Sequence, residues 1–211
     1  LFAGAFSNTS QICVATKRLY VHNDIYDDVR DRLVAMAKSA EVGDGSEQGI
    51  QFGPIQNKAQ FERVKDLLQS ARDAGLTLYQ ADPIKSDGYF VPFTIVDNPP
   101  ENSRVVQEEA FGPILPMMRF TDIDEVIGRA NDTEYGLAGA VWSADLDKAR
   151  EVAERLDTGT VWINQNLQMT PGTPLAGAKQ SGFGAENGLY GLKEFTQLKA
   201  VYIPKSAANV S

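Results

Sequence analysis

The segment Ser7–Arg18, SNTSQICVATKR, holds the only cysteine among the 211 residues, Cys13. A cysteine thiolate is a strong nucleophile, yet free cysteines are also among the most frequently buried residues. The only histidine, His22, follows at the end of a predicted strand, and such a strand rises about 3.3 Å per residue. We therefore expect this imidazole to lie too far away to act as a base for Cys13. A nucleophilic Cys13 would instead need backbone donors, a helix N-terminus or a bound cationic cofactor.

A second candidate segment is Gln107–Pro116, QEEAFGPILP, in which Glu108 and Glu109 precede a Phe-Gly-Pro turn. A carboxylate accepts hydrogen bonds from both hydroxyls of a diol such as a ribose. Phe111 offers a flat apolar face beside it. The competing interpretation is a solvated acidic turn without a ligand.

A third segment, Pro174–Gly188, is rich in glycine. Its Gly182-Phe183-Gly184 matches neither the G-x-G-x-x-G nor the G-x-x-x-x-G-K-[ST] phosphate motif. We expect a tight loop that passes close to a ligand or to other backbone. A structural role is expected for Lys179 rather than a Schiff base.

Composition narrows the function classes. The formal net charge of −8 argues against nucleic-acid binding and against anionic membranes. No apolar run is long enough to span a bilayer. A single cysteine excludes an internal disulfide framework and a cysteine-rich metal site, so no metal is expected, and it fits a cytoplasmic location.

Strand-like and helix-like segments alternate along the chain, which predicts an α/β fold: a mostly parallel twisted sheet flanked by helices. The predicted strands are Arg18–His22, Leu76–Gln80, Val91–Val96, Pro113–Phe120, Ala138–Ser143, Gly159–Asn164 (a buried strand) and Leu198–Ile203. Prolines argue against a regular central position for the start of Pro113–Phe120. The predicted helices run from an Asn23 or Asp24 cap to about Ala40, from Asn57 to Ala74 with Gly75 ending it, from a Thr121/Asp124 capping box through Ala130, over Leu146–Leu156, and near Leu189–Thr196.

Taken together and in this order, the segments resemble the aldehyde dehydrogenase superfamily. The family's G-Q-x-C motif with a following basic residue stands here as Ser10-Gln11-Ile12-Cys13, with Arg18 after it. Four further motifs match: E-E-x-F-G-P at Glu108–Pro113, N-x-T-x-Y-G-L at Asn131–Leu137, G-T-V-W-[VI]-N at Gly159–Asn164, and P-F-G-G-x-K-x-S-G-x-G-R-E, recognisable at Pro174–Glu186. Five motifs in the family's order cover essentially the whole chain.

The resemblance implies oxidation of an aldehyde to a carboxylic acid with NAD or NADP as cofactor. Cys13 would attack the aldehyde, and the thiohemiacetal would lose hydride to leave a thioester that water cleaves. Glu109 matches the carboxylate on the nicotinamide ribose, Phe111 the ring beside the nicotinamide, and Gln60 a further cofactor-side contact. The positions that match the substrate tunnel are Ile12, Val14, Met169, Leu175 and Glu186, the last being a carboxylate linked to proton or water relay. A homo-oligomer, dimer or tetramer, is also implied.

Three positions depart from the family pattern. Ser10 replaces the usual glycine, Leu175-Ala176 the usual Phe-Gly pair, and Ala185 the usual arginine. Leu175 together with Met169 predicts an aliphatic, adaptable tunnel.

The resemblance also predicts the domain organisation. Residues 1–197 match the catalytic domain, and 198–211 match an oligomerisation strand, Leu198–Ile203, followed by a disordered tail. In the family the general-base glutamate of an E-L-G-G segment, the oxyanion asparagine and the cofactor-binding domain all lie upstream of the cysteine, where this chain has only twelve residues. We therefore expect this chain on its own to be largely inactive. Two alternatives stay open: a non-catalytic interaction module of the same fold, and a cysteine esterase or thioesterase.

Overall fold

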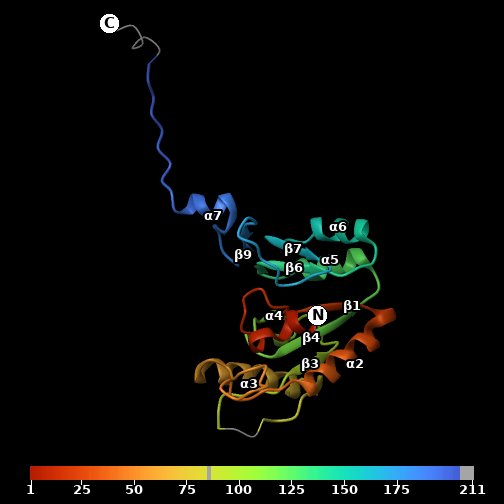
Figure 1. The fold of residues 1–211 in the computed structure, drawn as a ribbon. Helices are drawn as coiled ribbons and strands as arrows, with labels where there is room; N and C mark the ends of the chain where they lie inside the picture. Colours follow the sequence, from red (N-terminus) through yellow and green to blue (C-terminus); the bar gives the residue numbers. More distant parts are fainter. Residues whose placement is uncertain (85–86, 205–211) are drawn as a thin grey trace.

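A computed structural model describes residues 1–84 and 87–204, and its centre is a four-stranded sheet (Figure 1). The strand order is β1 (Leu19–His22), β4 (Ile114–Phe120), β3 (Thr94–Asp97) and β2 (Thr77–Gln80). β1, β4 and β3 run parallel, and β2 joins the edge antiparallel to β3. The predicted α/β fold with a mostly parallel sheet is confirmed.

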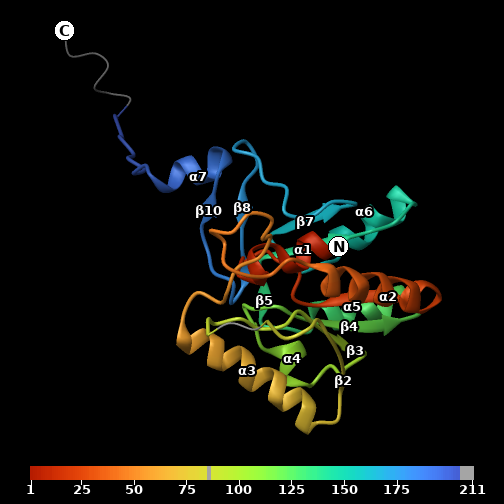
Figure 2. The same cartoon turned by 60° about the horizontal axis from the view of Figure 1, so that its bottom comes forward.

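Helices cover both faces of this sheet, as Figure 2 shows for α2 (Asn23–Ser39) and α3 (Lys58–Asp73). Neighbouring residues of one strand point to opposite faces. Met117 accordingly packs with α2 and with α1 (Phe2–Phe6), whereas Met118 packs with α3 and with α4 (Arg104–Gln107). Burial on both faces explains why β3 and β4 are almost continuously apolar.

A second layer lies beside the sheet (Figure 1) and contains the parallel pair β6 (Ala138–Val141) and β7 (Thr160–Ile163). Its helices are α5 (Ile123–Asn131) and α6 (Leu146–Glu154). Two short antiparallel pairs follow, β5 (Tyr135–Gly136) with β9 (Ala178–Lys179) and β8 (Leu175–Ala176) with β10 (Ala185–Glu186), and then α7 (Gly188–Glu194). We predicted a buried strand at Gly159–Asn164, but in β7 only Trp162 is buried, because the β6–β7 ribbon carries no third strand in the part of the chain described.

Gly159, just ahead of β7, shows why a motif glycine is needed here. A Cβ atom at this position would stand 1.7 Å from the carbonyl oxygen of Ala176. Only glycine therefore allows β7 to approach the glycine-rich segment this closely.

The structure corrects two predicted helix caps. α2 is capped by the His22 side chain, whose Nδ1 accepts from the Asp24 N–H, rather than by Asn23 or Asp24. α5 is capped by Asp122, whose Oδ1 accepts from the Glu125 N–H at 2.8 Å, rather than by Thr121. In both cases a strand leads almost directly into the helix, and the cap lies within two residues of the position predicted. The Asn57 start of α3 and Gly75 after its end, with φ of +70°, are as predicted.

The prolines of β4 fit the register of the sheet. β3 pairs with residues 114–117 and β1 with residues 117–120, so Pro116 has a strand partner on one side only. A proline lacks the N–H that a second ladder would need. The prediction that this strand does not start in a regular central position is confirmed.

Leu198–Ile203 forms no strand in this chain, contrary to our prediction. Residues 197–204 have no regular secondary structure, and the Leu198 and Tyr202 side chains are 97% and 94% exposed. Figure 1 shows this segment leading away from the body of the molecule. A strand needs a partner ladder, and no strand in the described ranges pairs with it. The tail predicted to be disordered lies, beyond Pro204, outside the described residues. No helix within those ranges is long and apolar enough to cross a membrane.

Candidate active site

Sheet register brings two of the candidate segments together. The Cys13 segment leads into β1, and the Glu108–Pro113 segment leads into β4. β1 and β4 are parallel neighbours in which Leu19 lies opposite Met117. Cys13 and Phe111 precede this pair by the same number of residues. Both loops therefore lie at the amino ends of the same two strands.

The turn that carries Cys13 is strained and held from several sides. Asn8, Thr9 and Ser10 have φ of 50°, 57° and 61°, a left-handed conformation that costs a non-glycine residue roughly 1 kcal/mol. Thr9 Oγ1 donates to the carbonyl of Gly53 at 2.8 Å, and the buried Ser10 Oγ donates to the carbonyl of Ala5. These bonds stabilise a backbone that presents Cys13 with an exposed side chain.

Gln11 connects this turn to the segment ahead of α3. Its Nε2 donates to the Pro54 carbonyl at 3.2 Å, and its Oε1 accepts from the Gln56 N–H at 2.9 Å. Of the two predicted tunnel residues beside Cys13, Val14 is only 6% exposed and so offers little surface to a substrate. Ile12 is half-buried and offers surface next to the thiol.

The two adjacent glutamates have different environments. The Arg104 guanidinium donates two hydrogen bonds to the Glu108 carboxylate and thereby holds the pKa of Glu108 below its usual range. Arg63 lies 3.7 Å from the same carboxylate. The half-buried Glu109 carboxylate makes no hydrogen bond or ion pair with any residue that the structure describes. Glu109 is thus the carboxylate whose oxygens are available to a ligand.

Phe111 has φ of 45°, and Gln60 holds this loop in place. Gln60 Nε2 donates to the carbonyls of Ala110 at 2.6 Å and Phe111 at 3.3 Å. Its own backbone N–H is bound by the Asn57 cap of α3. The amide that we predicted to contact the cofactor therefore positions Phe111.

Lys17 is a site residue that the sequence analysis missed. Its Nζ donates to the Ser10 carbonyl at 2.6 Å and lies 4.9 Å from the Phe111 ring centroid. The resemblance instead directed attention to the next basic residue, Arg18. That guanidinium donates to the carbonyls of Arg129 and Ala130 and so binds the last turn of α5. The signal for Lys17 in the sequence was a basic side chain four residues after Cys13.

The remaining predicted tunnel residues fall into two groups. Met169, 54% exposed, follows Gln168, whose carbonyl accepts from Trp162 Nε1 at 2.7 Å. Asn166 in the same loop donates to Thr16 Oγ1 at 2.9 Å, which ties the loop to the Cys13 turn. The second group is one cross-strand pair, Leu175 opposite Glu186 in β8 and β10. No hydrogen bond or ion pair within the described ranges joins that pair to the Cys13 turn.

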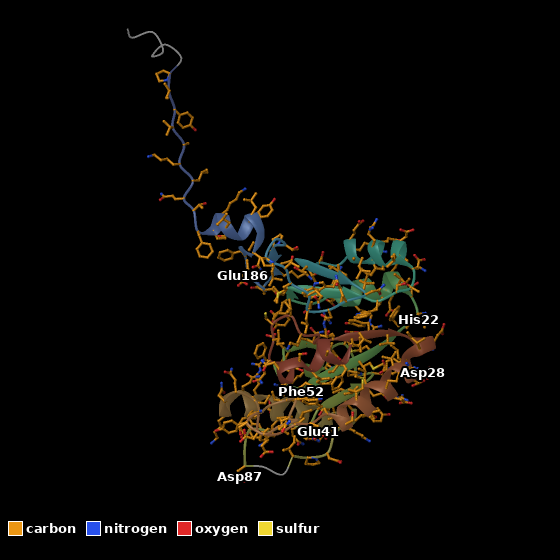
Figure 3. All side chains as sticks on the ribbon, viewed as in Figure 1. His22, Asp28, Glu41, Phe52, Asp87 and Glu186 are labelled. Carbon is orange, nitrogen blue, oxygen red and sulfur yellow. The ribbon has the colours of Figure 1, made fainter. Side chains whose placement is uncertain are left out.

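His22 and Lys179 have structural contacts. His22 caps α2, lies 3.5 Å from Asp24 and meets the Phe120 ring edge-on. Figure 3 shows it on the opposite side of the molecule from Glu186. Lys179 Nζ donates to the Asn131 carbonyl at 2.6 Å, which fits the structural role expected for it.

Comparison with known proteins decides the family. The model described as "Aldehyde dehydrogenase family" matches residues 1–201. The chain belongs to the aldehyde dehydrogenase family. A probable aldehyde dehydrogenase from a Pseudomonas species is 43% identical over 204 residues, covering 96% of this chain and 41% of that protein. The cytosolic aldehyde dehydrogenase 1 of Macroscelides proboscideus is 40% identical over 98% of this chain and 41% of its own length.

Solved aldehyde dehydrogenases have the same fold. The NAD⁺ complex of the Bacillus cereus enzyme superposes with a TM-score of 0.93 at 36% identity, covering 97% of this chain and 42% of that one. Betaine aldehyde dehydrogenase from Staphylococcus aureus, solved with NAD⁺, gives 0.88 at 35% identity, over 92% of this chain and 39% of its own. This aldehyde dehydrogenase chain thus spans about two fifths of the relatives' length.

Proposed function

We propose that this chain is the catalytic domain of an NAD(P)-dependent aldehyde dehydrogenase that oxidises an aldehyde to a carboxylic acid. The observation that carries the proposal is the state of Cys13. Its side chain is exposed, and its backbone N–H has no acceptor among the residues described. An attacking sulfur and an unused hydrogen-bond donor on one residue suit a nucleophile that also stabilises the oxyanion it creates.

In the proposed reaction, Cys13 supplies the nucleophile and one donor to the oxyanion. The Cys13 thiolate adds to the aldehyde carbon, and the electron pair of the carbonyl moves to the oxygen, which the Cys13 N–H can bind. The nicotinamide cofactor, when bound, supplies the hydride acceptor. Loss of hydride from the same carbon leaves a thioester on Cys13. Water then cleaves the thioester, releasing the carboxylic acid and the thiol.

The cofactor-side residues fit a dinucleotide. Glu109 has a half-buried carboxylate without a protein partner among the described residues, and two hydroxyls of one ribose would satisfy both of its oxygens. The backbone of Phe111 is left-handed, a conformation that glycine adopts more easily than phenylalanine. A phenylalanine here therefore costs free energy, which fits a binding role for its ring. Gln60 donates to the backbone carbonyl of Phe111, and the Lys17 ammonium lies over its ring.

Replacement of Cys13 by alanine tests the proposal in the parent protein that contains this chain. We expect Cys13→Ala to lower aldehyde-dependent NADH formation by roughly a thousand-fold or more, because the covalent route is lost. A Cys13→Ala enzyme that retained wild-type rates would refute the nucleophile. The Lys148→Met variant, at an exposed position of α6, is the control and is expected to keep the wild-type rate.

The 211-residue chain by itself is proposed to turn over little, since it spans about 41% of relatives such as the Pseudomonas protein. Robust NADH formation by this chain alone would contradict that.

An esterase is disfavoured because the only histidine is used to cap α2. Esterase activity that needs Cys13 but no cofactor would revive it. A cytoplasmic location is proposed because a nucleophilic Cys13 must stay reduced.

A further inference from the structure

Lys17 joins the two loops of the candidate site through one ammonium group. Nζ donates to the carbonyl of Ser10, in the turn of Cys13, and lies over the ring of Phe111, in the loop of Glu109. Both Ser10 and Phe111 have positive φ. The lysine therefore contacts one strained residue in each loop, where a small shift of backbone would move the thiol or the ring.

The charge around Lys17 is arranged to act on the same two loops. Burial lowers the pKa of the Lys17 ammonium to about 8, while the negative charges of Glu109 and Cys13 act in the opposite direction. In the described part of the chain, Glu109 forms no ion pair, so no such pair weakens the electrostatic interaction between Glu109 and Lys17. At neutral pH the ammonium is thus mostly charged and interacts electrostatically with both the thiol and the proposed ribose carboxylate.

We propose that Lys17 is a positioning residue that holds the Cys13 turn against the Phe111 loop and keeps a positive charge beside the thiol. The inference rests on the proposed function in taking Cys13 as the nucleophile. A cation near an attacking sulfur stabilises the negative charge on that sulfur and so speeds its reactions. The hydrogen bond to Ser10 also offsets the cost of a serine where the family has glycine.

Alkylation by iodoacetamide tests the inference, because Cys13 is the only thiol and the reaction needs no cofactor. At pH 7 we expect Lys17→Met to react about five- to ten-fold more slowly than wild type, and Lys17→Arg within two-fold of it, since arginine retains the charge. Lys148→Met, a remote exposed lysine, is expected to react like wild type.

The pH profile separates charge from mere packing. Between pH 7 and pH 8 a growing fraction of the wild-type lysine loses its proton, whereas the guanidinium of the Lys17→Arg variant stays charged. The ratio of the Lys17→Arg rate to the wild-type rate is therefore expected to be higher at pH 8 than at pH 7. Circular dichroism and urea unfolding check that Lys17→Met is folded; if it is not, the Lys17→Arg profile alone decides.

Three results would overturn the inference: a Lys17→Met rate equal to wild type, a Lys17→Arg rate as slow as that of Lys17→Met, or a ratio of the Lys17→Arg rate to the wild-type rate that does not change between pH 7 and pH 8. Failure of the proposed function is a separate outcome. Wild-type NADH formation by the parent Cys13→Ala enzyme would remove the nucleophile, whatever the alkylation rates show.

Discussion

At the scale of single residues, the site depends on side chains that make an unfavourable backbone tolerable. Ser10 occupies a left-handed conformation, and two hydrogen bonds hold it: its own Oγ to the carbonyl of Ala5, and Lys17 Nζ to its carbonyl. The departure from the family's glycine is therefore accommodated locally. The same logic applies to Phe111, which Gln60 holds through its carbonyl.

Two variants of Ser10 separate the free-energy cost of its left-handed backbone from the contribution of its side-chain hydrogen bond to Ala5. Both Ser10→Ala and Ser10→Gly lose the buried hydrogen bond, which costs about 1 to 3 kcal/mol. Glycine also relieves the left-handed strain, so we expect Ser10→Gly to be about 1 kcal/mol more stable than Ser10→Ala. Urea unfolding of the two variants measures the difference. Equal stabilities, or a more stable alanine variant, would show that the backbone there is unstrained.

At the scale of elements, two parallel strands do most of the assembly. β1 and β4 receive the Cys13 turn and the Phe111 loop at the same end of the sheet. α3 begins beside them, so that Gln60 in its first turn reaches the loop. The helices that cover both faces fix this register by burying the alternate residues of the strands.

The cap of α5 provides a test at this scale, because sequence and structure disagree on its residue. Asp122→Ala removes the acceptor of the Glu125 N–H and is expected to cost about 1 kcal/mol of unfolding free energy. Thr121→Ala is the matched control, with an expected change within about 0.5 kcal/mol. Thermal or urea unfolding distinguishes them; a larger loss for Thr121→Ala would restore the capping box predicted from the sequence.

At the scale of the whole molecule, the carboxyl-terminal segment is apolar and exposed. Val201 and Ile203 are 71% and 77% exposed, next to the almost fully exposed Tyr202. Apolar side chains with unpaired backbone are typical of a strand that pairs with another chain. The homo-oligomer expected from the family resemblance would use this segment, and that remains a prediction.

Charge on the segment tests this expectation. We expect the double variant Val201→Asp, Ile203→Asp to shift the chain towards the monomer, because buried carboxylates without partners oppose strand pairing. Sedimentation velocity over a range of protein concentrations measures the change. Met36→Asp, at a 47% exposed position on α2, is the control for an added charge alone. Identical sedimentation of the double variant and wild type would exclude the segment as an interface.

The sequence by itself determined the alternation of strands and helices, the start of α3 at Asn57, and the resemblance that named Cys13, Glu109 and Phe111. Such features depend on residue type and on neighbours a few positions away. Only the tertiary structure decided which carboxylate is free, that Gln60 holds the Phe111 loop, and that Lys17 bridges two loops far apart in the chain. The physical reason is that strand register sets those contacts, and register follows from the burial of both sheet faces. Leu198–Ile203 shows the same rule in reverse: β-prone residues form no strand until another strand supplies the ladder.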